Sequence, residues 1–192
     1  SRNAAQILQA AAIRHPNQQI LFLPDKYLGA VALAQSGVDP ERVDLYDGAC
    51  HVHSKISENA LEEAWDRYPD AELLIHPECG CASSCMARTL RGEMRYKNAY
   101  FFSTEEMLWH AQQSPAREFI VATEKGMVYR LRKEVPNKAF YPVSPDAVCE
   151  YMKVNTLEKL LESLRHDRVE IVIDEETRQK ARTAIDRMLT IH

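Results

Sequence analysis

The segment His76-Pro77-Glu78 carries two side chains that can transfer protons. A histidine titrates near neutral pH, and burial can raise the pKa of a glutamate, so the pair suits acid–base chemistry. The proline between them holds His76 in extended geometry, which would fix the pair rigidly. The same segment also fits a plain turn that ends a strand. The residue types alone leave both readings open.

The five cysteines offer a second kind of chemistry. Three of them lie within seven residues: Cys79, Cys81 and Cys85. This density suits a zinc or iron–sulfur site, a redox disulfide, or unlinked thiols, and we keep these three alternatives. Cys50 precedes His53 by three residues, but no second ligand pair completes a zinc-finger spacing. Cys149 stands alone among apolar residues, which favours a buried packing role.

A helix start at Ser103-Thr104 is a candidate anion site. Ser103 is followed three residues later by Glu106, which is the spacing of a capping box. Such a cap can serve the helix alone, or it can also bind an anion at the helix N-terminus. Both alternatives stay open at this point.

Short apolar runs that alternate with amphipathic stretches must position these side chains. We expect strands over residues 20–23, 43–46, 73–75, 99–102, 119–122 and 139–141. We expect helices over residues 3–13, 29–35, 58–68, 84–91, 104–113, 156–165 and 174–189. This alternation predicts an α/β fold with parallel sheets covered on both faces. Most of the reactive side chains directly follow strands, at the edge where open α/β sheets bind ligands.

Six strands are more than one small sheet needs, so we expect two similar three-layer αβα units. The first would span residues 1–92 and carry Cys50 and the His-Pro-Glu motif. The second would span residues 93–165 and carry the Ser-Thr cap and Cys149. Residues 166–192 would form a C-terminal helix.

The composition excludes several classes of protein. The 192 residues include 24 basic and 28 acidic side chains, which are interspersed and give a net charge of −4. This balance lacks the basic footprint of a nucleic-acid-binding protein. No apolar run approaches the roughly 20 residues of a membrane span, and no secretory signal pattern opens the sequence. We therefore expect a cytoplasmic protein with no membrane partner, whose cysteines are reduced or bound to metal.

Taken together, the motifs resemble the quinolinate synthase family, the iron–sulfur enzymes of NAD (pyridine nucleotide) biosynthesis. Ser1-Arg2-Asn3-Ala4 is similar to the family's Ser-Ser-Asn-Ala, and the later motifs follow in the family's order and spacing. The matching segments are residues 1–4, 23–29, 48–53, 76–79, 103–107, 119–126 and 149–152.

The resemblance implies three αβα domains around a pseudo-threefold axis, with a [4Fe–4S] cluster held by one cysteine from each domain. It implies a transferase-type condensation of iminoaspartate with dihydroxyacetone phosphate to quinolinate, with one iron open to substrate. An iminoaspartate-producing oxidase would be a partner. By position in the motifs, Cys50 and Cys149 would be cluster ligands, and His76 and Glu78 would be catalytic. The substrate-binding residues would be Ser1, His53, His76, Pro77, Glu78, Ser103 and Thr104.

The sequence departs from the family pattern in two places. It matches the second and third domains, so the third cysteine ligand would come from an N-terminal domain, and the isolated chain would be a poor catalyst. Residues 79–90 look like an insertion, and we expect a lid, a redox switch or a structural role there. Two alternative functions remain. One is a metal- or redox-binding module built on Cys79, Cys81 and Cys85, and the other is a non-catalytic fragment.

Overall fold

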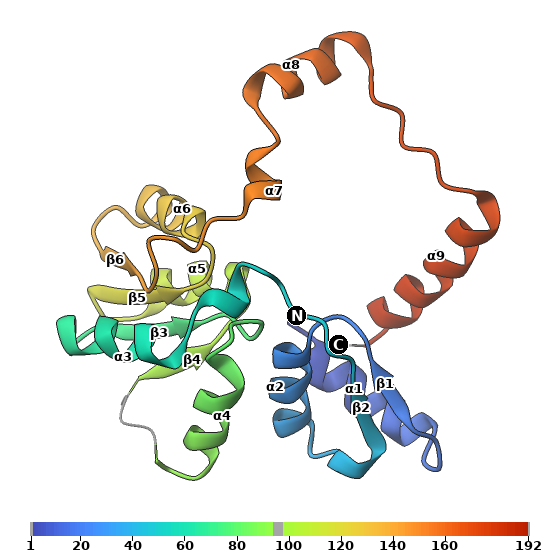
Figure 1. Ribbon diagram of the computed structural model, residues 1–192, viewed down its shortest axis with the longest axis horizontal. Helices are drawn as coiled ribbons and strands as arrows, with labels where there is room; N and C mark the ends of the chain where they lie inside the picture. The colour runs from blue at the N-terminus through green and yellow to red at the C-terminus, as the bar shows by residue number, and fades with distance from the viewer. Residues whose placement is uncertain (1, 94–97, 192) are drawn as a thin grey trace. The chain divides into compact units, whose positions relative to one another are not determined.

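A computed structural model describes residues 2–93 and 98–191 (Figure 1). The chain forms two compact units, Ser1–Val148 and Cys149–His192. We call these the N-terminal unit and the C-terminal unit.

The N-terminal unit alternates helices and strands along the sequence, as expected for an α/β fold. Its helices are α1 (Ala4–Arg14), α2 (Lys26–Ser36), η1 (Pro40–Arg42), η2 (His53–Lys55), α3 (Glu58–Arg67), α4 (Ala82–Leu90), α5 (Thr104–Gln113) and α6 (Gly126–Glu134). Its strands are β1 (Ile20–Phe22), β2 (Val43–Leu45), β3 (Glu72–Ile75), β4 (Ala99–Phe101), β5 (Glu118–Ala122) and β6 (Ala139–Pro142).

The strands form two sheets, one with the order β1-β2 and one with the order β4-β3-β5-β6. Every strand pair is parallel, which confirms the predicted α/β class with parallel sheets. In the register of the larger sheet, Ile75 at the end of β3 lies opposite Ala122 at the end of β5. Side chains that follow these two strands therefore start from neighbouring points of one sheet edge.

Strand β3 was expected in the first αβα unit, and it pairs with β4, which was expected in the second. The four-stranded sheet therefore crosses the boundary expected near residue 92. The sequence around that boundary is polar, but main-chain hydrogen bonds join β3 to both β4 and β5. Division of the chain at residues 92 and 165 stays a prediction.

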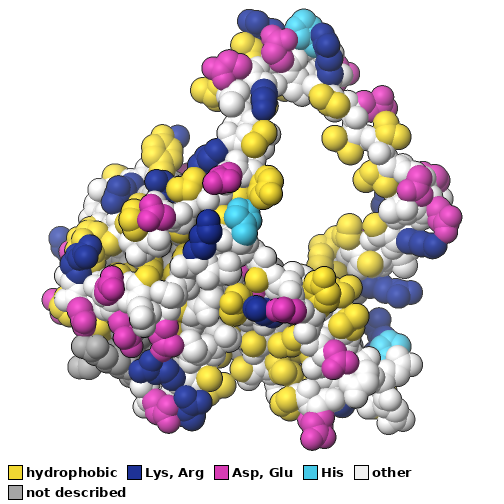
Figure 2. Space-filling view, viewed as in Figure 1, with side chains coloured by type: hydrophobic (Ala, Val, Ile, Leu, Met, Phe, Trp, Pro, Cys, Tyr) yellow, Lys and Arg dark blue, Asp and Glu magenta, His cyan; other side chains and the backbone are white. Residues whose placement is uncertain are grey.

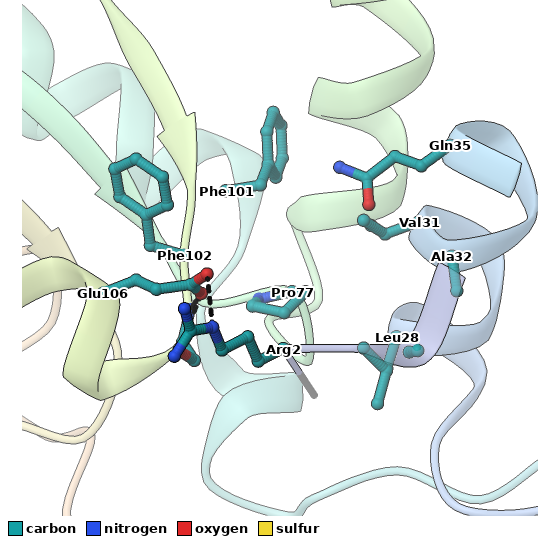
Figure 3. A pocket seen from close by; sticks show the side chains of 11 residues that line it. Arg2, Leu28, Val31, Ala32, Gln35, Pro77, Phe101, Phe102 and Glu106 are labelled. Atoms are coloured by element: carbon teal, nitrogen blue, oxygen red, sulfur yellow. Dashed lines mark hydrogen bonds and ion pairs between the residues drawn. The ribbon is translucent and has the colours of Figure 1, made fainter. Parts of the chain in front are cut away.

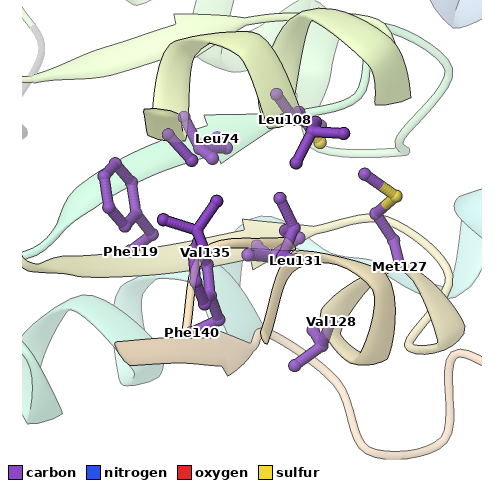
Figure 4. Close-up of a cluster of buried hydrophobic side chains, with 11 residues drawn as sticks. Leu74, Leu108, Phe119, Met127, Val128, Leu131, Val135 and Phe140 are labelled. Carbon is purple, nitrogen blue, oxygen red and sulfur yellow. The ribbon is translucent and has the colours of Figure 1, made fainter. Parts of the chain in front are cut away.

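A cluster of buried apolar side chains packs α5 and α6 against the four-stranded sheet (Figure 4). Phe119 of β5 is fully buried and stacks on Phe140 of β6, with 5.2 Å between the ring centroids. Helix α6 was not expected from the sequence, although it supplies three of the cluster's residues: Met127, Val128 and Leu131. This core fixes the ends of β3 and β5.

The C-terminal unit consists of α7 (Glu150–Lys153), α8 (Leu157–His166) and α9 (Glu175–Leu189). The side chains of Thr156 and Asp174 cap α8 and α9 by accepting hydrogen bonds from main-chain N–H groups. None of its residues from 149 to 191 is buried. Figure 2 shows apolar side chains exposed along this segment, between charged residues of both signs. Within the described ranges of the chain, no helix combines the length and the apolar character that crossing a membrane requires.

Candidate active site

The end of β3 and the end of β5 place two polar side chains side by side. His76 directly follows β3 and Thr123 directly follows β5, and both are buried. The main-chain N–H of His76 donates a hydrogen bond of 3.0 Å to the carbonyl of Ala122, which continues the sheet ladder by one step. The sheet itself therefore sets the position of His76.

A loop after His76 brings His53 to the same place. The N–H of Gly80 donates to the carbonyl of His53 over 3.0 Å, and the N–H of Cys81 donates to the carbonyl of Ile56 over 3.1 Å. A Cβ atom on Gly80 would lie 3.0 Å from the carbonyl oxygen of Ser54, closer than most side-chain contacts. Glycine at this position lets the loop lie directly against η2.

Three side chains converge at this edge. His53 Nδ1 lies 3.3 Å and His76 Nδ1 lies 4.0 Å from Glu78 Oε2. The two imidazole rings stack with 4.6 Å between centroids and 20° between planes. On its other side, His53 Nε2 lies 2.9 Å from Thr123 Oγ1. The sequence predicted His53, His76 and Glu78, and the structure brings these three together.

The electrostatics favour a neutral His76 and an ionised Glu78 at neutral pH. Burial, together with the neighbouring His53, lowers the pKa of His76 to about 4, although Glu78 opposes this shift. The His53 imidazole beside Glu78 holds the pKa of that carboxyl below its usual value, against the effect of burial. The site therefore combines a carboxylate acceptor with a neutral imidazole.

The contacts also assign the protons of the two rings. The N–H of Glu78 donates to His76 Nδ1 over 3.3 Å, so the proton of neutral His76 belongs on Nε2. His53 Nδ1 has no hydrogen bond of good geometry within the described residues, but it lies nearest the Glu78 carboxylate. The proton of neutral His53 therefore belongs on Nδ1, which faces the carboxylate. The hydroxyl of Thr123 then donates a hydrogen bond to His53 Nε2. His76 Nε2–H can therefore donate a hydrogen bond to a ligand, and the Glu78 carboxylate can accept one.

The same three side chains also have the spacing of a metal site. The ligand atoms of His53, His76 and Glu78 all lie within 4.8 Å of one another. Among the described residues, no other group of three histidine, cysteine or acidic side chains comes together in this way. Two imidazoles and one carboxylate could hold a divalent transition metal.

A cavity of about 180 Å³ lies between α2 and the start of α5 (Figure 3). Two predicted substrate-binding residues, Pro77 and Ser103, line it, together with Arg2 and the apolar side of α2. Glu106 accepts hydrogen bonds from the N–H and the hydroxyl of Ser103, and its other oxygen lies 3.5 Å from Arg2 Nε. The predicted capping box is present. Thr104 is exposed as the first residue of α5, and Ser1 lies outside the described residues.

The two predicted cluster cysteines are both partly exposed. Cys50 lies in the loop after β2, where its N–H donates to Asp25 Oδ2 over 3.0 Å. Asp25 is buried and also accepts hydrogen bonds from the first turn of α2, so it ties this loop to the helix. Cys149 immediately precedes α7, in the C-terminal unit. Its expected packing role is not observed, because its side chain is not buried.

The other three cysteines are buried, and none of the five is part of a disulfide. The thiol of Cys79 donates to the carbonyl of Ala122 over 2.9 Å. A hydrogen bond with Cys79 raises the pKa of Cys81, and a hydrogen bond with Cys81 raises the pKa of Cys85; burial adds to both shifts. Burial and a raised pKa both disfavour the reactive thiolate at Cys81 and Cys85.

Sequence reasoning selected neither Thr123, Asp25 nor Arg2 as a site residue. Thr123 and Asp25 each closely follow a predicted strand, at the edge where the active site was expected. This position in the sequence was the signal that could have identified them as site residues. Arg2 is the residue at which Ser1-Arg2-Asn3-Ala4 departs from the Ser-Ser-Asn-Ala pattern that the resemblance implied. That substitution was visible, but its contact with Glu106 across the cavity depends on the fold.

Comparison with known proteins identifies relatives of this chain. The family model described as quinolinate synthetase A protein matches residues 1–190. The chain is 44% identical to quinolinate synthase from Pyrobaculum aerophilum over 188 residues, which is 98% of this chain and 58% of the relative. It is 44% identical to the enzyme from Thermus thermophilus over 191 residues, covering 100% of this chain and 57% of the relative. For the Synechococcus enzyme the identity is 39%, with 100% and 56% covered. The chain thus spans little more than half the length of these curated relatives.

Proposed function

The chain belongs to the quinolinate synthase family, and we propose that it supplies the acid–base residues and two cluster cysteines of a quinolinate synthase. In the proposed reaction, iminoaspartate condenses with dihydroxyacetone phosphate to give quinolinate, phosphate and two molecules of water. The observation that carries the proposal is the meeting of His53, His76 and Glu78 at one sheet edge. Forming the ring requires protons to leave carbon and to reach departing oxygen atoms, and these side chains suit both tasks.

Each of the three side chains has a distinct part in the proposed mechanism. Glu78 is the base, because its low pKa keeps the carboxylate ionised and able to accept a substrate proton. His76 binds a substrate oxygen through Nε2–H, and its low pKa keeps it a neutral hydrogen-bond donor. His53 lies between Thr123 and Glu78 and holds the carboxylate in position.

The donor set of the chain fits an iron–sulfur cluster. Cys50 and Cys149 are partly exposed, whereas Cys79, Cys81 and Cys85 are buried, and the pKa values of Cys81 and Cys85 are raised. Cys50 and Cys149 would hold a [4Fe–4S] cluster, with the third cysteine supplied from outside this chain. When bound, the cluster supplies an iron with an open position, a Lewis acid for a substrate oxygen.

Substrate binding is proposed at the cavity and at the helix start beside it. Pro77 and Ser103 line the cavity, and the first turn of α5 with Thr104 suits a phosphate or carboxylate group. Ser1 is assigned to the same role from its place in the first motif. We also propose that the protein works in the cytoplasm and receives iminoaspartate from an oxidase. The isolated chain would then have little activity, since one cluster ligand is supplied from elsewhere.

The cluster assignment is tested by anaerobic reconstitution of the complete protein, followed by iron and sulfide analysis and a quinolinate assay. Cys50→Ser is expected to lose the stable cluster and the activity. Cys85→Ser is the matched control, because it removes a buried thiol that is not assigned to the cluster, and it should retain both. Normal activity in Cys50→Ser would contradict the assignment.

A further inference from the structure

Asp25 is a buried acidic residue that the proposed reaction does not use. It is 4% exposed and lies shortly after β1, whereas Cys50 lies in the loop after β2. The two strands are parallel neighbours, with Phe22 opposite Leu45, so the segments that leave them start from the same edge. A buried carboxylate is costly unless hydrogen bonds satisfy its oxygens. The hydrogen-bond partners of Asp25 therefore indicate its role.

The two carboxylate oxygens of Asp25 have separate partners. Oδ1 accepts hydrogen bonds of 2.9 Å from the N–H groups of Tyr27 and Leu28, and so caps α2. Oδ2 accepts a hydrogen bond of 3.0 Å from the N–H of Cys50. A helix cap needs only one oxygen, since serine serves about as well as aspartate at this position. The second oxygen therefore serves the loop that carries Cys50.

Hydrogen bonds hold the main chain of Cys50 on both sides. Its N–H donates to Asp25, and its carbonyl accepts a hydrogen bond of 2.9 Å from the N–H of Ser54 in η2. Just before it, the carbonyl of Gly48 accepts a hydrogen bond of 2.8 Å from the N–H of Lys26. These contacts fix the main chain from which the Cys50 thiol extends. The contact with Asp25 is the one of these three that a side chain makes, so a substitution can remove it.

We propose that Asp25 is a positioning residue for Cys50: it holds the main chain of this ligand ready for the cluster and keeps the Cys50 N–H from the cluster sulfurs. The inference rests on the proposed function, in which Cys50 is a cluster ligand. Loss of a group that orients a metal ligand typically weakens metal binding by about 10–100-fold. The reduction potential of a cluster depends on nearby charge and on hydrogen bonds to its sulfurs. Asp25 therefore affects both the retention and the potential of the cluster.

Two substitutions remove the contact with Cys50 and keep the helix cap. Asp25→Asn retains one oxygen for α2 and replaces Oδ2 by an NH2 group, which cannot accept a hydrogen bond. Asp25→Ser retains a single capping oxygen and is the second variant if the first folds poorly. In the complete protein, reconstituted anaerobically, each variant should release iron to a chelator about 10–100-fold faster than wild type. The reduction potential of the cluster should also rise, because a negative charge is removed and the Cys50 N–H is released.

Asp47→Asn is the matched control, because it makes the same chemical change in the loop that carries Cys50. The Asp47 side chain is 87% exposed and pairs with Lys26, so its loss removes only a surface ion pair. This variant should keep the iron release and the reduction potential of the wild type.

Cys50→Ser, assayed alongside, separates this inference from the cluster assignment. If Cys50→Ser loses the cluster while both Asp25 variants keep wild-type iron release and potential, the positioning role is overturned and the assignment stands. Faster iron release at an unchanged potential would show a purely structural role for Asp25 and would overturn the proposal as well. If Cys50→Ser keeps a stable cluster, the assignment fails, and the positioning role fails with it.

Discussion

The sheet edge at β3 and β5 and the segment from α7 to α9 differ in what holds them in place. At the sheet edge, His76 is fixed by the main-chain ladder and His53 is held by the loop through Gly80, and the strands that lead to this edge are packed by the core that contains Phe119. The C-terminal unit has helices and caps but no buried residue between 149 and 191. The proposed acid–base residues are therefore preorganised by the chain itself, whereas Cys149 lies in a unit whose residues 149–191 form no buried core.

The largest expected effect separates the two regions by stability. Phe119→Ala removes a fully buried ring and should lower the free energy of unfolding of the 192-residue chain by about 3–5 kcal/mol. Leu164→Ala removes an exposed side chain from a helix, where alanine has a high propensity. This variant should therefore change the free energy of unfolding by less than about 0.5 kcal/mol. Urea denaturation of both variants measures the difference. Equal losses would show that the two regions are equally packed.

A pH dependence sharpens the comparison at the sheet edge. Folding lowers the pKa of His76 from 6.5 to about 4, so the folded state favours the neutral ring. This stabilisation is fully present above pH 6.5 and is lost as the pH falls toward 4, and the part lost between pH 7 and pH 4.5 is about 2 kcal/mol. The pKa of Glu78 is lowered from 4.5, so its own contribution is lost only at lower pH.

Urea denaturation between pH 7 and pH 4.5 measures this loss, and His76→Gln supplies the control. The variant should be less sensitive to pH over that window by the same amount. If wild type and variant lose stability in parallel, His76 is not the titrating group.

The smallest expected effect lies at the cavity. Arg2 is 72% exposed on its side chain and meets Glu106 at 3.5 Å, so this ion pair is screened by solvent. A double-mutant cycle with Arg2→Ala and Glu106→Gln should give a coupling of about 0.2–0.5 kcal/mol. A coupling several times larger would place the cavity among the rigid parts of the molecule, together with the sheet edge.

Local patterns in the sequence predicted the parallel strands and the residues that follow them. The apolar runs at β3 and β5 pointed to the sheet edge, and His53, His76 and Glu78 do meet there. Helix α6 was overlooked although Met127, Val128 and Leu131 have helical spacing, because charged residues surround them. The pairing of β3 with β4 across a polar segment could not be predicted, because strand pairing depends on tertiary packing and not on the local sequence.

The cysteine-rich segment shows a similar limit. Its spacing suggested metal or redox chemistry, but burial of Cys79, Cys81 and Cys85 depends on how the loop packs on η2 and on β5. The contact of Arg2 with Glu106 joins residues far apart in the sequence, and no local pattern signals it.

The central claim is that the preorganised sheet edge performs the acid–base chemistry of quinolinate formation. The most direct test is the rate of quinolinate formation by the complete protein carrying Glu78→Gln, with iron and sulfide content matched to the wild type. The account predicts a loss of about 10²–10⁴-fold with the cluster content unchanged, while Glu63→Gln on the exposed side of α3 has no effect. A rate close to wild type in Glu78→Gln would contradict the account.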